Sequence, residues 1–225
     1  MGKNEELQKK VQDAIHWEPL LSDAEVGVVS KDGIIALTGI VDSFEKKCQA
    51  ESAAKTVRGV KAIIETIDVK FNTYSIRESD NDIAKEALNA LKLNSEVPDE
   101  RVKVKVENGW ITLDGDLTWH FQKKSAEKAI RNIYSVIGVT NNIKIKSEIL
   151  DSIEKKDVEN AIARNSTINN QSINVNVFGT RVTLTGSVDS WYQRDEAGRI
   201  AWNTPGICTL ENELKVEYEY ELLDN

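Results

Sequence analysis

The sequence predicts an α+β protein made of three tandem αββαβ modules, each a three-stranded mixed sheet with two helices on one face. Two observations support this prediction. A string that ends in glycine occurs three times, with glycines at positions 39, 115 and 186. Around each glycine, apolar residues recur at the same distances and with the periodicities of helix, strand, strand, helix and strand. The expected modules are residues 1–72, 78–147 and 151–219.

Each module is expected to begin with a helix and a β-hairpin. In the first module Val11, Ala14 and Ile15 follow the i, i+3, i+4 spacing of one helical stripe. A strand of alternating apolar residues comes next, then a tight turn at Asp32-Gly33, and at Asn108-Gly109 in the second module. Such dipeptides favour hairpins because both residues can adopt positive φ.

The repeated glycine lies on the apolar face of the second strand, because side chains alternate along a strand. Glycine at such a position permits close approach of another backbone. We interpret Gly39, Gly115 and Gly186 as structural residues that let a helix pack tightly on the sheet.

A second helix and a third strand complete each module. Gly59 and Gly206 lie before the third strand and are predicted to end the helix with a left-handed cap. The second module has Ser135 at this position, which is expected to make the end of the helix less sharp. Gly138 is expected to take over part of the capping. Asn141 and Asn212 occupy one inward position of the third strand, where we expect hydrogen bonds to a loop backbone.

Composition and motifs exclude several classes of function. The net charge is −8, and no third of the chain has the basic excess that nucleic-acid binding requires. No H-E-x-x-H, C-x-x-C, G-x-G-x-x-G, P-loop or G-x-S-x-G string occurs. We therefore expect no enzyme activity, catalytic residue, metal or cofactor. Two cysteines, Cys48 and Cys208, are expected to be free thiols.

The sequence as it stands favours a cytoplasmic location. No apolar run approaches the ~20 residues of a membrane-spanning helix. The charged N-terminus does not have the apolar core of a signal peptide. A periplasmic location remains the alternative if a signal peptide has been removed.

Aromatic residues recur where the second helix of each module begins. Two interpretations stay open: the aromatics cover the edge of the sheet, or they contact a lipid headgroup layer or a partner. Basic residues follow the aromatics, and basic groups beside aromatics favour contact with anionic lipid. The candidate contact residues are Phe44, Trp119, Phe121, Trp191, Tyr192, Lys123 and Lys124.

The uncovered sheet face of the first module is unusually apolar, with Val29, Ile34 and Ala36 among its residues. Contiguous apolar patches usually mark a contact site. We predict that another module or a second copy of the chain covers this face, which makes oligomerisation through it possible. A partly exposed face is the alternative. Trp202 replaces the Lys55 of the first module at one helix position and is predicted to be a packing contact.

The repeats resemble the BON family, the bacterial OsmY and nodulation domains. The third module carries the resemblance best, with V-T-L-T-G-S-V at Val182–Val188 and G-I-C-T-L-E-N-E-L-K-V at Gly206–Val216. The resemblance implies a small non-catalytic module of periplasmic, envelope or stress-related bacterial proteins that binds phospholipid surfaces or envelope partners. A cytoplasmic protein–protein interaction scaffold is the alternative function.

Overall fold

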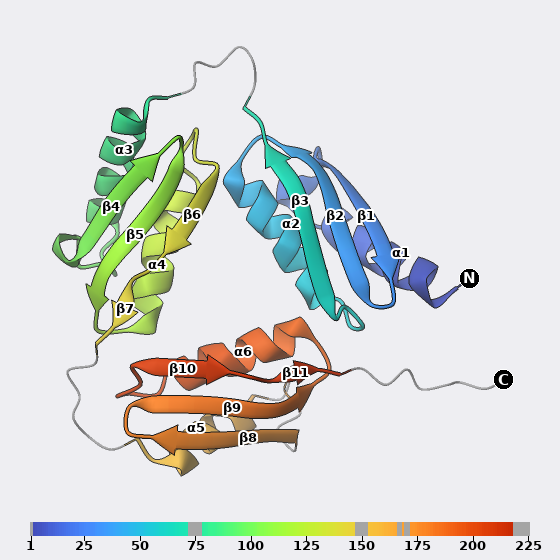
Figure 1. Cartoon of the computed structure of the whole chain (residues 1–225), viewed down its shortest axis with the longest axis vertical. Helices are drawn as coiled ribbons and strands as arrows, with labels where there is room; N and C mark the ends of the chain where they lie inside the picture. Colours follow the sequence, from blue (N-terminus) through green and yellow to red (C-terminus); the bar gives the residue numbers. More distant parts are fainter. Residues whose placement is uncertain (1, 72–77, 147–152, 166–167, 169–171, 218–225) are drawn as a thin grey trace.

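A computed structural model describes residues 2–71, 78–146, 153–165, 168 and 172–217 of the chain. The described chain forms three αββαβ modules, so the predicted α+β class and tandem repeat are confirmed. In each module two helices cover one face of a mixed sheet (Figure 1).

Module 1 contains the first two helices and three strands of the chain. Its elements are α1 (Lys3–His16), the short 3₁₀ helix η1 (Pro19–Leu21), β1 (Glu25–Lys31), β2 (Ile34–Val41), α2 (Phe44–Thr56) and β3 (Ala62–Val69).

Module 2 repeats this order, with its third strand divided in two. Its elements are α3 (Asp80–Leu93), the 3₁₀ helix η2 (Asp99–Arg101), β4 (Val102–Glu107), β5 (Trp110–Leu117), α4 (His120–Arg131), β6 (Gly138–Asn141) and β7 (Lys144–Ile145). Module 3 has α5 (Lys155–Ala163), β8 (Ile173–Phe178), β9 (Arg181–Val188), α6 (Trp191–Trp202), β10 (Thr209–Asn212) and β11 (Lys215–Val216).

The second strand of each module lies in the middle of its sheet, a strand order that periodicity alone does not determine. In module 1, β1 pairs antiparallel with β2, and β3 pairs parallel with β2. Modules 2 and 3 have the same pairing around β5 and β9. A parallel third strand requires a crossover connection, and the second helix of each module provides it.

Each module buries its own core between the helices and the sheet. Ile35 and Leu37 on β2 are completely buried, as are Leu113 on β5 and Leu184 on β9. Side chains alternate between the two faces of each strand. In β2 every second residue is buried or half-buried against the helices, and the residues between them point to the open face. The helix and strand periodicities therefore correspond to one two-layer unit per repeat.

The repeated glycines are structural, but for a different reason from the expected one. Each has a positive φ, 142° at Gly39, 147° at Gly115 and 115° at Gly186. A Cβ on Gly115 would lie 2.1 Å from the carbonyl oxygen of Arg101, the residue just before β4. The equivalent contacts are with the carbonyls of Glu25, the first residue of β1, for Gly39 and of Ser172, just before β8, for Gly186. The close approach is thus between two strands, and the expected helix contact is wrong.

The turns and helix ends follow the predicted conformations, with one correction. Asp32 and Gly33 have φ of 53° and 84°, as a tight hairpin requires. Gly59 and Gly206 have φ of 95° and 91°. Ser135 adopts the same left-handed conformation, with φ of 65°.

The exit from α4 is therefore as sharp as the other two, contrary to expectation. Ser135 is buried, and its Oγ accepts a hydrogen bond from the backbone N–H of Glu78 at 3.0 Å. Gly138 begins β6 without the positive φ of a left-handed cap. The ring of Trp110 lies 2.4 Å from where a Cβ on Gly138 would be. This glycine makes room for the indole instead.

Candidate functional site: the cleft between the modules

The second helices of the three modules, α2, α4 and α6, face the centre of the molecule (Figure 1). Local sequence explains where each helix begins. Ser43 and Ser190 cap α2 and α6, their Oγ atoms accepting from the N–H groups of Lys46 at 3.3 Å and Gln193 at 3.2 Å. At α4 the side chain of Gln122 instead accepts from the N–H of Trp119 at 3.0 Å.

The first residue of each of these helices contacts the next module. Phe44 of α2 packs against the core of module 2. His120 of α4 stacks on Trp202 of module 3, with 4.5 Å between ring centroids and an angle of 4° between the planes. Trp191 of α6 packs against the core of module 1, and the Lys55 ammonium lies 5.9 Å from the centroid of its ring.

One position near the end of each helix also lies at these junctions. It is occupied by Lys55 in module 1, Arg131 in module 2 and Trp202 in module 3, each 16 residues after the repeated glycine. Burial would lower the pKa of Arg131, but Glu127 of the same helix and, to a smaller extent, Cys48 and Glu45 of α2 raise it. The first residue of one helix and the position near the end of another therefore meet at two junctions, His120 with Trp202 and Trp191 with Lys55. At the third junction Phe44 packs on the core of module 2 and Arg131 lies near Cys48 and Glu45, so the modules form a closed ring.

The junctions are held mainly by apolar and stacking contacts. Three buried polar atoms at them have no hydrogen-bond partner among the described residues: Glu45 Oε2, Arg131 Nε and Trp191 Nε1. Each unsatisfied buried group costs about 1–3 kcal/mol. One ion pair between described residues spans modules 1 and 3, joining Arg58 to Asp189 at 3.3 Å; the Arg58 side chain is exposed and the Asp189 side chain is partly exposed. Exposed pairs contribute at most about 1 kcal/mol.

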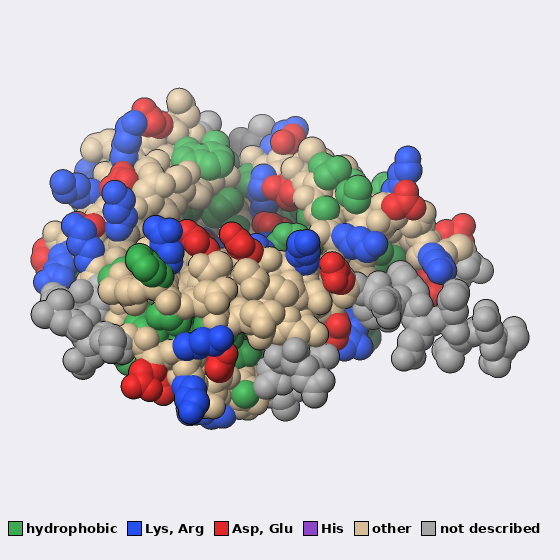
Figure 2. All heavy atoms as spheres, turned by 60° about the horizontal axis from the view of Figure 1, so that its bottom comes forward, with side chains coloured by type: hydrophobic (Ala, Val, Ile, Leu, Met, Phe, Trp, Pro, Cys, Tyr) green, Lys and Arg blue, Asp and Glu red, His purple; other side chains and the backbone are tan. Residues whose placement is uncertain are grey.

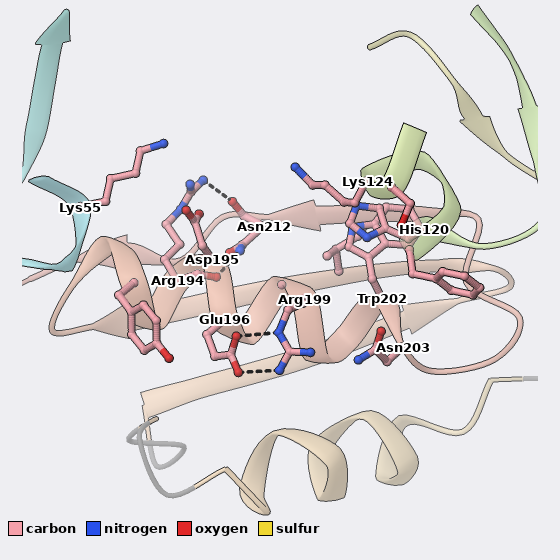
Figure 3. Close-up of a pocket in the computed structure, with 15 residues that line it drawn as sticks. Lys55, His120, Lys124, Arg194, Asp195, Glu196, Arg199, Trp202, Asn203 and Asn212 are labelled. Carbon is pink, nitrogen blue, oxygen red and sulfur yellow. Dashed lines mark hydrogen bonds and ion pairs between the residues drawn. The ribbon is translucent and has the colours of Figure 1, made fainter. Parts of the chain in front are cut away.

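A cleft of about 760 Å³ lies where the modules meet (Figure 3). Figure 2 shows a hollow between the modules with apolar, basic and acidic side chains around it. The charged or aromatic residues that line the cleft are Lys55, His120, Phe121, Lys124, Tyr192, Arg194, Asp195, Glu196, Arg199 and Trp202. Its four lysine and arginine side chains outnumber its two carboxylates, although the whole chain has a net charge of −8.

The environment of the cleft keeps His120 neutral. Burial, with smaller contributions from Lys124 and Lys123, lowers the pKa of His120 to about 4, against the opposing effect of Glu127. Burial would raise the pKa of Glu127, but Lys124 and Arg131 bring it below its usual value. A neutral imidazole can stack on an indole without the cost of a buried charge.

Among the basic residues of the cleft, Lys124 is the most available to a ligand. Its side chain is mostly exposed, 4.0 Å from Glu127. Arg199 is bound to Glu196 at 2.6 Å (Figure 3). Arg194 donates to the backbone carbonyls of Asn212 at 2.7 Å and Leu214 at 3.1 Å.

The residues proposed from the sequence as one contact surface have different surroundings. Phe121 and Tyr192 are exposed and line the cleft. Phe44 and Trp191 are half-buried against neighbouring modules. Trp119 is half-buried at the start of α4.

Lys123 holds its own module together. Its ammonium donates to the carbonyl of Ile143 at 2.7 Å, and burial lowers its pKa. Lys47 and Arg194, also eight residues after the repeated glycine, donate to carbonyls of the third strand in the same way. The recurrence of a basic residue at this position was the sequence signal for this hydrogen bond between the second helix and the third strand.

The inward polar position of the third strand belongs to the same arrangement. Asn141 Nδ2 donates to the carbonyl of Lys123 at 2.9 Å, and Asn212 Nδ2 donates to that of Arg194 at 2.7 Å. These carbonyls are in the second helix, not in a loop as expected. Each asparagine also accepts from a backbone N–H two residues ahead, which accommodates the break in the strand.

Clusters of metal ligands and membrane-spanning helices are absent from the described part of the chain. Its residues form no group of three or more His, Cys, Asp or Glu side chains that could hold a metal ion. No helix among them has the length and apolar character needed to cross a bilayer. Burial raises the pKa of the Cys48 thiol to about 11, so that thiol is protonated at neutral pH.

Comparison with known proteins identifies relatives of the repeats. The sequence model of the BON domain matches residues 3–70, 79–147 and 151–218. "Osmotically-inducible protein Y" of Escherichia coli (strain K12) is 26% identical over 147 residues, which cover 62% of this chain and 71% of that protein.

The solved structures that match include two of CdsD, a structural protein of the type III secretion system of Chlamydia trachomatis. The C-terminal domain structure is 15% identical, with a TM-score of 0.25 over 94% of this chain and 97% of that chain. The other is 17% identical, with a TM-score of 0.24 over 96% and 94%. Scores this low carry no argument about the arrangement of the modules.

Proposed function

With three BON domains the chain belongs to the BON family, and on that premise we propose that it is a stress-related, non-catalytic binding protein that associates with anionic phospholipid surfaces. The similarity to a protein named for osmotic induction supports the stress-related part. The cleft between the modules supports the binding part.

One observation carries the proposal: the cleft combines exposed aromatic rings with a local excess of basic side chains. Phe121 and Lys124 project from one turn of α4, and Tyr192 lines the cleft from α6. Aromatic side chains suit the border between lipid and water, and each basic residue near an anionic surface contributes about 1 kcal/mol. Because the whole chain is acidic, binding should depend on this local charge and weaken with added salt.

Co-sedimentation with vesicles tests the proposal. The full chain should bind vesicles of phosphatidylglycerol and phosphatidylcholine more strongly than phosphatidylcholine vesicles. Phe121→Ser combined with Lys124→Gln should lower binding to the anionic vesicles by roughly fivefold or more, because about 1 kcal/mol is lost with the charge alone. Unchanged binding by this folded double variant would exclude the cleft as the contact.

A matched double variant serves as the control. Phe178→Ser combined with Lys128→Gln also removes one exposed ring and one exposed lysine, and neither residue lines the cleft. Its binding should equal that of the unmodified chain. Loss of binding in the control would instead show that the contact lies outside the cleft.

A protein–protein scaffold is the second candidate function, and one observation favours it. Val29 and Ile34 on the open sheet face of module 1 are exposed, and Ala36 between them is half-buried. The described part of the chain does not cover this face, so intramolecular packing does not account for it. Trp202, the fourth residue predicted to be in a packing contact, lies at the junction of modules 2 and 3.

A further inference from the structure

The open sheet face of module 1 is apolar at its centre, unlike the open faces of the other two modules. Val29, Ala36 and Ile64 are register partners across the three strands, and Ile34 lies beside them. The exposed fractions are 58% for Val29, 42% for Ile34 and 54% for Ile64. Figure 2 shows hydrophobic side chains exposed over module 1, at the upper right of the view.

The equivalent faces of modules 2 and 3 have polar side chains that are paired with one another. Lys105, at the position of Val29, forms an ion pair with Glu107 at 2.9 Å. The indole N–H of Trp110 donates to Thr140 Oγ1 at 2.9 Å. These faces are suited to water, as one side of such sheets often is. The face of module 1 is the exception within the chain.

The charges of the module 1 face lie at its two ends. Lys31 is at one end of β1, in register with Ile34. Glu25 is at the other end of the same strand, and Asp68 is at that end of the sheet. No ion pair joins Lys31 or Glu25 to another described residue. Lys31 follows Glu25 by six positions along an extended strand, a distance of about 20 Å.

We propose that a second copy of this chain covers this face, so that the module 1 sheets pack face to face around a twofold axis parallel to the sheets and perpendicular to the strands. This axis places Lys31 opposite the partner's Glu25, twice by symmetry. The other in-plane axis, parallel to the strands, would place Glu25 opposite the partner's Asp68 and bring like charges together. Charge complementarity thus favours a second copy of the chain in this one orientation. The apolar centres of the two faces then meet between the charged ends.

The size of the face sets the strength of this contact. Three strands about 4.8 Å apart and about 25 Å long give a footprint of roughly 350 Å². Stable interfaces bury about 800 Å² on each partner. The dimer is therefore weak and reversible, and it dissociates on dilution. The inference is independent of lipid binding in the cleft.

Sedimentation velocity of the full chain over a concentration series tests the contact. The unmodified chain should show a dimer that increases with concentration, and Val29→Lys should reduce it at least tenfold. This variant is expected to fold, because module 2 has a lysine at the same position. Phe178→Lys is the matched control, since Phe178 is 87% exposed on module 3. A monomer at all concentrations, or a dimer insensitive to Val29→Lys, would overturn the proposal.

Charge exchange tests the orientation. Lys31→Glu should weaken the dimer, and adding Glu25→Lys in the same chain should restore it, because each partner again presents opposite charges. A zero-length carbodiimide cross-link between Lys31 and Glu25 should appear in the dimer alone, since ~20 Å is too far for a bond within one chain. Failure of the double exchange to restore the dimer, or cross-links in the monomer, would contradict this orientation.

Discussion

Gly39, Gly115 and Gly186 are required by the backbone of a neighbouring strand. The repeat in the sequence identified these positions, but alternation could say only which face of the strand they lie on. The physical reason is a positive φ together with a carbonyl oxygen that would be 1.9–2.3 Å from a Cβ. Neither quantity follows from periodicity, because both arise where two strands separated by a turn approach each other.

Gly115→Ala should therefore destabilise the protein. The new methyl would collide with the carbonyl of Arg101, and φ of 147° is strained for any side chain. We expect the free energy of unfolding to fall by about 1–3 kcal/mol, measured by denaturant titration. Gly179→Ala is the control, because Gly179 has a positive φ of 59° with no atom within 4 Å. Equal losses for the two variants would show that the close carbonyl is unimportant.

At the scale of elements, the second helices do two tasks. Their buried alanines, such as Ala50, Ala126 and Ala197, pack on the sheet of their own module, and their first residues contact another module. The sequence located these helices and their aromatic starts. It left open whether the aromatics cover a sheet edge or contact a partner, because the contacts of Phe44 and Trp191 are with modules distant in sequence.

The stack of His120 on Trp202 should make the stability of the chain depend on pH. His120 has a pKa of about 4 in the folded protein, against 6.5 for an ordinary histidine, chiefly because it is buried. The unfolded chain therefore takes up a proton at higher pH than the folded chain does. Stability due to this group is fully present above pH 6.5 and declines as the pH falls towards 4.

Thermal melting at a series of pH values measures this effect. His120→Phe keeps an aromatic ring on Trp202 but cannot be protonated. Its melting temperature relative to the unmodified chain should rise as the pH falls from about 6.5 to about 4. Parallel profiles for the two proteins would show that protonation of His120 does not oppose folding.

At the scale of the whole molecule, the sequence predicted the modules but not their arrangement. Each module is specified by local periodicities and turn dipeptides, which are repeated three times. The ring depends on pairs such as Phe44 with module 2 and Trp191 with Lys55. Trp202 was the one residue whose place at a junction could be predicted. It replaces a lysine of the first module, which indicated a packing contact but not the partner.

Trp202→Lys should loosen the junction between modules 2 and 3 without unfolding either module. Lys55 shows that a lysine is compatible with this position of the repeat. Small-angle scattering should give a larger radius of gyration, with an unchanged far-ultraviolet circular dichroism spectrum. Trp17→Lys is the control, since Trp17 is exposed on module 1. An unchanged radius for Trp202→Lys would mean that the stack does not hold the junction.

The closed ring has a consequence for how the chain could have grown by duplication. A head-to-tail contact either continues indefinitely as a filament or returns to its start. Here the third copy meets the first, so each module contacts both of the others and no end is left unoccupied. A fourth copy would find both of its contact positions without partners. Each junction could then diverge separately, as the tryptophan, arginine and lysine found at one shared position illustrate.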